Sequence, residues 1–517
     1  MTRVWTLAAL QLNRGPMSAI LSSRTLLPML AAAALAVAGC GRQEEGVSRV
    51  AAIGQHPRLV ETVSAPLSAG DALLRQNMAQ GLVRFDEHGQ VVPGLAERWN
   101  VSDDGLSYIF RLQTGDWPDG RKIRADEVAR ILSRQLRPSS TNPLKDTLGA
   151  ISEVVAMTDR VIEIRLIAPR PNLLQLLAQP ELGLVRASVG TGPFRIPTAE
   201  EVAAIPNDKD SKGALLLTHR IYIPDAEDPI EKVRISGGDA RTLVAAFAEG
   251  KLDLVVGGTV DDLPIALAQK MPRGALRFDP VAGLFGLAPT RRSDVLQEAD
   301  VRRLLSRAID RPALIDGLRV GGLVPRATLL QAGLEGTGQP PQPAWLGQPA
   351  SERMPALVAE ANRIFGGTDR PTIRIAIPDG PGGKYLLARL AYDWRPIGIT
   401  VVRAPNMASA DLVWVDEVAP SISPAWFVRR FRCGVTAICV EEAEQLLEQA
   451  RATVDGRQRA ALFLEAARLM DEAQLFIPIA APIRWSLVSG RSPGFAENPF
   501  ARHTLVGLAN ERFSGSR

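Results

Sequence analysis

The most informative stretch of the sequence spans residues 80–136, which read QGLVRFDEHGQVVPGLAERWNVSDDGLSYIFRLQTGDWPDGRKIRADEVARILSRQL. Within it, Trp117-Pro118-Asp119-Gly120 predicts a tight turn, because Pro presets φ, Asp caps the turn and Gly adopts a positive φ. The apolar residues of 125–136 fall on one stripe, which predicts an amphipathic helix. Residues 161–168 instead alternate between apolar and polar side chains, as a strand does. The stretch therefore begins a mixed helix-and-strand fold.

The alternation of strands and helices continues towards the C-terminus. Helices are predicted at 298–316, 440–454 and 457–473, and extended segments at 231–236, 252–257, 371–377, 398–403 and 411–416. Proline and glycine predict surface loops at 332–350 and 378–383. Such alternation favours α/β domains with parallel or mixed sheets. The chain has 517 residues, too many for one core, so we expect two or three domains.

The N-terminal 39 residues have the pattern of a secretory signal. They contain three arginines and no acidic residue, followed by a 15-residue apolar run over 25–39 that leads directly to Cys40. This run contains Pro28 and is too short for a membrane span of about 20 residues. Leu35-Ala36-Val37-Ala38-Gly39-Cys40 resembles a bacterial lipobox, which implies diacylation of Cys40 and cleavage before it. An ordinary signal or a buried apolar helix is the alternative. Met17 is an alternative start that gives a signal of more usual length, and residues 40–46 are a short polar tether.

Removal of this signal changes what the charge of the chain implies about its partners. Hydrophobic residues make up 46% of the chain and charged residues 22%, which argues against collagen-like, wholly disordered and polytopic membrane proteins. The formal charge of +4 suggests an anionic partner such as nucleic acid. Cleavage before Cys40 leaves 478 residues and a charge of +1, because the signal contains three arginines and no acid. The basic charge therefore belongs to the signal, and we expect no nucleic-acid partner.

Residues 80–136 resemble the beginning of the family 5 extracellular solute-binding proteins, the peptide and nickel binders of ABC importers. Further similarities follow in the family's order along essentially the whole mature chain. The matching segments are Gly81-Leu82-Val83, Pro93–Trp99, Asp104–Tyr108, Trp117–Gly120, Ala125–Val128, Gly190–Phe194, Gly250–Asp253, Ala299–Arg303, Ala308–Arg311, Ile397–Val401 and Ile477–Ile479. So many fixed spacings make the resemblance specific, although most of these motifs have a structural reading as turns and helix ends.

The resemblance implies an α/β type II periplasmic-binding-protein fold, with two lobes, a hinge and an inserted subdomain. By analogy, the first lobe takes residues 47–66, 188–285 and 478–517. The inserted subdomain takes 67–187 and the second lobe 286–477. A solute would bind between the two lobes, and closure about the hinge would bury it.

The resemblance also implies a function and its partners. The chain would be a monomeric, lipid-anchored periplasmic protein that captures a small solute, foremost a peptide, and delivers it to a membrane permease driven by an ATPase. It would need no cofactor and catalyse no reaction. A sensor or structural lipoprotein that reuses the fold without transport is one alternative, and an exported hydrolase is another.

Patterns typical of catalytic or metal sites are mostly absent from the sequence. Its four histidines lie far apart and form no H-E-x-x-H motif, so we expect no metal site. Gly190-Thr191-Gly192 lacks the third glycine of a dinucleotide fingerprint and is followed by Pro193, so we expect a turn. Residues 378–385 resemble a phosphate loop but have Pro378 at the first glycine and Tyr385 at the Ser or Thr.

Candidate ligand-binding residues come from the family's cleft segments. In peptide-binding relatives, an Asp just after a Trp pairs with the ligand's α-amino group, which implies this role for Asp416 or Glu417 here. Trp414, which precedes them in the same segment, is also a candidate ligand-binding residue. The fuller family pattern is absent here, and a surface acidic loop is the alternative. Residues 283–287 should cross between the lobes, which makes Phe285 a candidate wall residue. Trp426 is another candidate, and core packing is the alternative for both aromatic residues.

Cys433 and Cys439 are separated by five residues. In an exported protein, two such thiols favour a disulfide over a metal pair. A disulfide across so short a loop would contribute about 2 kcal/mol through loop-closure entropy. Two buried free thiols are the alternative.

Overall fold

A computed structural model of the chain describes residues 46–61, 63–203, 213–222, 228–366, 370–436 and 438–509. The expected signal at 1–39, the alternative start Met17, the expected lipidation site Cys40 and nearly all of the tether lie outside these residues. Residues 46–517 belong to one structural unit. None of its described helices combines the length and the apolar character that crossing a bilayer requires.

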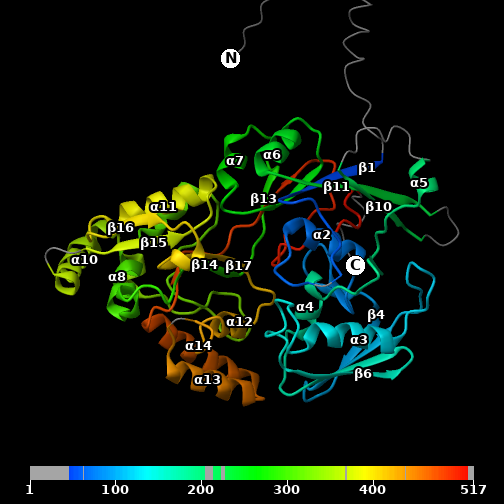
Figure 1. Cartoon of the computed structure of the whole chain (residues 1–517), viewed down its shortest axis with the longest axis horizontal. Coiled ribbons are helices and arrows are strands. Elements are labelled where there is room, and N and C mark those ends of the chain that lie inside the picture. The colour runs from blue at the N-terminus through cyan, green and yellow to red at the C-terminus, as the bar shows by residue number, and fades with distance from the viewer. Residues whose placement is uncertain are drawn as a thin grey trace, which may run out of the picture. The chain divides into compact units, whose positions relative to one another are not determined.

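A mixed six-stranded sheet contains both the first and the last strand of the described chain (Figure 1). Its strand β1 (Val47–Ile53) runs parallel to β11 (Ile230–Gly238) on one side and to β12 (Leu254–Gly258) on the other. Three strands join in antiparallel pairing to give the order β10-β11-β1-β12-β19-β13: β10 (Leu215–Arg220), β19 (Trp485–Val488) and β13 (Leu276–Phe278). The helices of this part are α2 (Ala69–Met78), α6 (Ala240–Ala248) and α7 (Leu263–Ala268).

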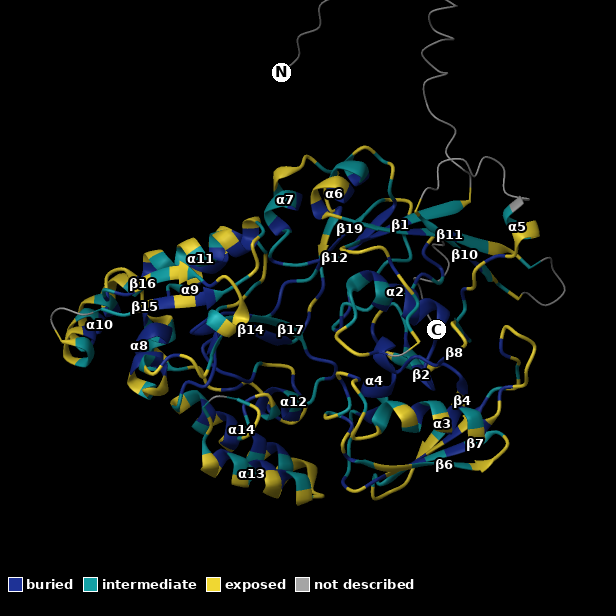
Figure 2. Ribbon diagram, in the orientation of Figure 1, coloured by how far each residue is buried: buried dark blue, intermediate teal, exposed yellow. Residues whose placement is uncertain are grey.

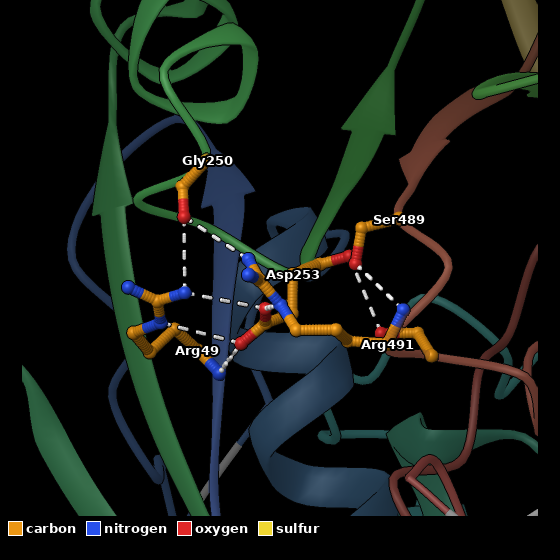
Figure 3. Close-up of polar contacts among 6 residues, drawn as sticks. Arg49, Gly250, Asp253, Ser489 and Arg491 are labelled. Atoms are coloured by element: carbon orange, nitrogen blue, oxygen red, sulfur yellow. Dashed lines mark hydrogen bonds and ion pairs between the residues drawn. The ribbon is translucent and has the colours of Figure 1, made fainter. Parts of the chain in front are cut away.

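Asp253 ties three distant segments of this sheet together (Figure 3). Its carboxylate, 4% exposed, accepts hydrogen bonds from the backbone N–H of Arg49 at 2.7 Å and from the guanidinium groups of Arg49 and Arg491. The carbonyl of Gly250 accepts from the same two guanidinium groups, at 3.0 Å each. The Gly250–Asp253 motif therefore joins the beginning of β1 to β12 and to the segment after β19.

A five-stranded sheet forms a second layered part of the fold. Its order is β16-β15-β17-β14-β18, in which β14 pairs antiparallel with β17 and β18 while β15 pairs parallel with β16 and β17. The strands are β14 (Gly283–Pro289), β15 (Thr372–Ala376), β16 (Thr400–Arg403), β17 (Leu412–Val418) and β18 (Ile477–Pro478). The helices are α8 (Ala299–Ala308), α9 (Arg311–Leu318), α10 (Ala350–Phe365) and α11 (Pro381–Trp394).

The single helix predicted at 298–316 is wrong, because two helices occupy this region. Helix α8 ends at Ala308, and Asp310 caps α9 by accepting a hydrogen bond from the N–H of Ala313 at 3.3 Å. Pro312 lies in the first turn of α9, where it lacks an N–H and its ring would clash with the preceding helical turn. Proline therefore separates two segments that share one apolar periodicity.

The loop predicted at 378–383 is also partly wrong, since α11 begins at Pro381. Gly382 and Gly383 form its first turn, and a Cβ on Gly382 would lie 1.9 Å from the carbonyl oxygen of Val260. The Asp261 carboxylate accepts hydrogen bonds from the N–H groups of Gly380 at 3.2 Å and Gly383 at 2.9 Å. This long-range cap lets a glycine-rich segment begin a helix.

A four-stranded antiparallel sheet with one long helix forms a third part, within residues 83–190. Helix α3 (Ala125–Leu136) has the predicted bounds, and Gly120 of the predicted turn has φ +81°. The buried indole N–H of Trp117 donates to Glu127 in the first turn of α3, at 2.9 Å. The sheet order is β4-β5-β7-β6, with β4 (Ala96–Val101), β5 (Ser107–Leu112), β6 (Ile151–Thr158) and β7 (Val161–Leu166). Nearby are β2 (Val83–Phe85), β3 (Val91–Pro93), α4 (Leu173–Leu177), η1 (Pro180–Leu182), β8 (Val185–Arg186) and β9 (Val189–Gly190).

Three helices form a group with its own core: α12 (Pro424–Arg429), α13 (Glu441–Ala452) and α14 (Gly456–Glu472). The disulfide Cys433–Cys439 lies between α12 and α13, with its Cα atoms 5.1 Å apart. The remaining short helices are α5 (Ala199–Ala203), η3 (Val295–Gln297), η4 (Ala344–Gly347) and η5 (Met407–Ser409). Figure 2 shows buried residues along the sheets and on the inner faces of the helices that flank them.

Candidate ligand-binding site

Strand β17 carries three of the predicted site residues, and the adjacent β14 carries a fourth. Phe285 pairs with Asp416 in the antiparallel register of these strands, and Leu287 pairs with Trp414. The rings of Phe285 and Trp414 pack edge to face, with centroids 4.8 Å apart, and both side chains are buried in the core. The structure thus places these two aromatic residues in packing contacts, away from the walls of the two cavities described next.

A cavity of about 690 Å³ lies among segments of the two larger sheets, and we call it the inter-sheet cavity. One side comes from Ile53, the first turn of α2 and residues 256–259 at the end of β12. Residues 416–420 at the end of β17 and residues 484–485 at the beginning of β19 provide further wall. The inter-sheet cavity therefore brings together Asp416, Glu417 and Trp426 from the predicted set.

Asp416 already has an ion-pair partner within the protein. Its carboxylate lies 2.7 Å from Arg484, and the two side chains are 15% and 17% exposed. Arg484 also donates to the main-chain carbonyls of Ile483 and Asp416, at 2.9 and 3.0 Å. Burial raises the pKa of Asp416, Arg484 acts in the opposite direction, and repulsion from Asp261 adds to the rise. The predicted amine-binding carboxylate is therefore held in place by an arginine.

Acidic groups nevertheless outnumber basic ones at this end of the inter-sheet cavity. Asp262 lines the cavity, and in the described part of the chain it has no ion-pair partner. Burial and the neighbouring Asp261 raise its pKa, while a hydrogen bond from Thr259 lowers it. Asp261 raises the pKa of both Asp262 and Asp416, so these three carboxylates lie near one another, and Arg484 pairs with Asp416. This arrangement favours a cationic group in the cavity.

Glu417, the other predicted carboxylate, lies in a more exposed position. Its ion pair with Arg430 is 2.5 Å long, and both side chains are more than 40% exposed. The guanidinium of Arg430 lies 6.0 Å from the ring centre of Trp426. Such exposed pairs contribute little to stability or to local charge, so Asp416 is the better placed of the two to affect a ligand.

Two polar side-chain pairs complete another wall of the inter-sheet cavity. The half-buried Arg502 donates to the buried carboxylate of Glu181 at 2.9 Å, and the buried ring of His503 lies 3.3 Å from the carboxylate of Asp279. The prediction from sequence did not include these residues or Arg484. Arg484 did have a signal, because it is the one charged residue in the apolar segment 475–488, where a charge requires a buried partner.

Metal binding finds no support in the described residues, where no group of three His, Cys, Asp or Glu side chains could hold an ion. The carboxylates of Asp262 and Asp416 and the donors of Thr259 and Arg484 line the inter-sheet cavity and provide charge and hydrogen bonds for an organic solute.

Comparison with known proteins gives the same fold. The model described as bacterial extracellular solute-binding proteins, family 5 Middle, matches residues 90–411, more than half of the chain. Heme-binding protein A of Haemophilus influenzae is 23% identical, over 93% of this chain and 98% of its own length. Probable di/tripeptide-binding protein 5 of Pseudomonas aeruginosa is 24% identical, over 83% and 89%. The crystal structure of Haemophilus influenzae OppA with the peptide RPPGFSPFR superposes with a TM-score of 0.74 at 15% identity, covering 90% of this chain and 99% of that one.

These findings confirm the predicted fold class, an α/β type II periplasmic-binding-protein fold. Both curated relatives match along most of their length, so the resemblance extends well beyond the segment 80–136. The chain belongs to the bacterial extracellular solute-binding proteins of family 5.

Proposed function

We propose that this protein captures a peptide in the inter-sheet cavity and delivers it to the permease of an ABC importer. The observation that carries the proposal is the group of carboxylates formed by Asp416, Asp262 and Asp261, which suits the ammonium group at the beginning of a peptide. The names of several relatives support peptides as the solute class, among them the di/tripeptide-binding protein and a dipeptide-binding protein of Escherichia coli. The chain itself would supply recognition and no chemistry.

We further propose that the two sheets define two lobes that close on the peptide. The first lobe would contain 47–66, 188–285 and 478–517, the second 286–477, and the inserted subdomain 67–187. The six-stranded and five-stranded sheets fall into different lobes under these boundaries, apart from β14, which begins at Gly283, and β18. Closure would remove water from the Asp416–Arg484 pair and strengthen its interaction with the peptide.

Peptides should raise the melting temperature of the purified protein. A ligand present at 100 times its dissociation constant stabilises the folded state by about 2.7 kcal/mol, which for a chain of this length is a shift of about 3 °C. A library of di- to pentapeptides is screened by differential scanning fluorimetry, and the co-purifying ligand is identified by mass spectrometry. If no peptide shifts the melting temperature and none co-purifies, the protein does not bind peptides.

We also propose that the protein is anchored to a membrane through a lipid on Cys40. The lipobox-like segment before this residue supports the anchor, and the periplasmic relatives support export. Cys40→Ser should move the protein from the membrane fraction to the soluble fraction and abolish metabolic labelling with palmitate. Labelling that survives in Cys40→Ser would contradict the anchor at this position.

A further inference from the structure

The larger of the two cavities has a volume of about 1400 Å³ and lies outside the inter-sheet cavity. Residues of 133–172, which belong to the four-stranded-sheet part, line one side, and residues of α12 and α14 line the other. Figure 1 draws these parts in cyan and orange. Hydrogen bonds from Asn172 to Glu335 and from Ile422 to Gln175 join loops next to the two sides.

Basic residues dominate this cavity, which we call the arginine cavity. Eight Arg and Lys residues line it, against four Asp and Glu residues. Within the part of the chain that the structure describes, Arg137, Arg170, Arg429 and Arg457 make no side-chain hydrogen bond and no ion pair. The arginine cavity therefore presents guanidinium groups whose donors are free to bind.

Among the basic residues that line the arginine cavity, Arg170 and Arg429 are the two whose pKa is lowered by burial. Both residues are half-buried, one on each side of the cavity. Burial first, and then repulsion from neighbouring arginines, lowers the pKa of each to about 10. The one carboxylate that acts on Arg429 is Glu448, which is ion-paired with Arg451 at 3.1 Å. Both guanidinium groups thus stay charged at neutral pH, where neither has an ion-pair partner among the described residues, and an anion would relieve this cost.

The arginine cavity adjoins the inter-sheet cavity. Pro143, Trp426 and Arg430 line both, so the two spaces share a wall at Trp426. Their charges are opposite, with excess carboxylates at Asp416 and excess guanidinium groups at Arg170 and Arg429. A solute with a cationic end and an anionic end would match both.

We propose that the arginine cavity receives an anionic group of the bound solute, a carboxylate or a phosphate, which pairs with Arg170 and Arg429. The inference rests on the proposed function, because the cationic part of the same solute would lie in the inter-sheet cavity. Bidentate pairing between guanidinium and carboxylate or phosphate oxygens is strong and directional, which makes arginine suitable for this purpose. The arginine cavity then selects solutes by the charge at the end opposite their cationic group.

Two variants and one control test the pairing. Arg170→Gln and Arg429→Gln each remove one guanidinium from the arginine cavity, and Arg241→Gln removes an exposed one from α6, outside both cavities. Calorimetry at constant ionic strength compares tri-alanine with its C-terminal amide, and pyrophosphate is added alone as the phosphate probe. The wild type should bind the acid about tenfold more tightly than the amide. Either cavity variant should bring this ratio close to one and leave the affinity for the amide unchanged, whereas Arg241→Gln should keep the ratio.

The melting temperature without ligand separates binding from a structural role. Because Arg170 and Arg429 repel their neighbours, either Gln variant should melt at the wild-type temperature or higher. A fall of several degrees in the melting temperature would show that the guanidinium stabilises the fold, and it would overturn the proposal. Equal binding of acid and amide, together with no effect of pyrophosphate, would also overturn it. If no peptide binds, the proposed function fails. The anion site would still be supported if pyrophosphate raises the melting temperature of the wild type but not that of Arg170→Gln or Arg429→Gln. A response to pyrophosphate but equal binding of acid and amide identifies phosphate as the anionic group.

Discussion

Asp416→Asn should weaken the binding of tri-alanine by about 100-fold, a loss of about 2.7 kcal/mol. The Asp416 carboxylate is 15% exposed and forms, with Asp261 and Asp262, the acidic excess that we assign to the ammonium group. The substitution removes one of these charges and leaves Arg484 positive and without its carboxylate. Titration calorimetry on the purified variant measures the loss.

Glu417→Gln is the matched control, because Glu417 is the adjacent residue on the same cavity wall. Its pair with Arg430 is exposed, so we expect less than a threefold change in affinity. N-acetylated tri-alanine, which lacks the ammonium group, should bind weakly to the wild type and be almost insensitive to Asp416→Asn. A larger loss in Glu417→Gln than in Asp416→Asn would assign the amine to Glu417 instead.

Asp416→Asn should remain folded, which keeps the affinity measurement interpretable. Arg484 retains the main-chain carbonyls of residues 483 and 416 as acceptors, at 2.9 and 3.0 Å. Its guanidinium is 17% exposed and can gain water where the carboxylate charge is lost. We therefore expect the loss of affinity to exceed any loss of stability.

Local patterns predicted the elements that depend on nearby residues. Helix α3 and the turn at Gly120 agree with the sequence because their capping, periodicity and positive φ are properties of adjacent positions. The beginning of α11 could not be predicted in this way. Gly382 and Gly383 are helical because Asp261, more than a hundred residues earlier, accepts hydrogen bonds from their N–H groups and from that of Gly380.

The family resemblance predicted part of the candidate site. It indicated Asp416 and Trp426, which line the inter-sheet cavity, but it could not identify Arg484, which lies 68 residues after Asp416. The arginine cavity is harder still to predict, since Arg170 and Arg429 meet only when the four-stranded-sheet part lies beside α12. Whether an arginine has a carboxylate partner therefore depends on the tertiary structure, which brings together residues that are far apart in the sequence.

Asp253→Asn should lower the free energy of unfolding by about 3 kcal/mol, near the lower end of the range of about 3–5 kcal/mol for breaking a buried ion pair. The Asp253 carboxylate is 4% exposed and neutralises both Arg49 and Arg491, while accepting the backbone N–H of Arg49 (Figure 3). The two arginine side chains are 26% and 46% exposed, so water can solvate them in the variant, which limits the loss.

Urea unfolding followed by circular dichroism measures this change, with Glu249→Gln as the control. Glu249 pairs with Lys251 in the same loop, but both side chains are more than half exposed, and we expect a change within about 0.5 kcal/mol. Because the Asn side chain keeps the shape of Asp, a difference between the two variants reports the buried charge and not a cavity. Equal unfolding midpoints for the two variants would mean that Asp253 contributes no more than a surface charge, and that packing alone holds β1, β12 and the segment after β19 together.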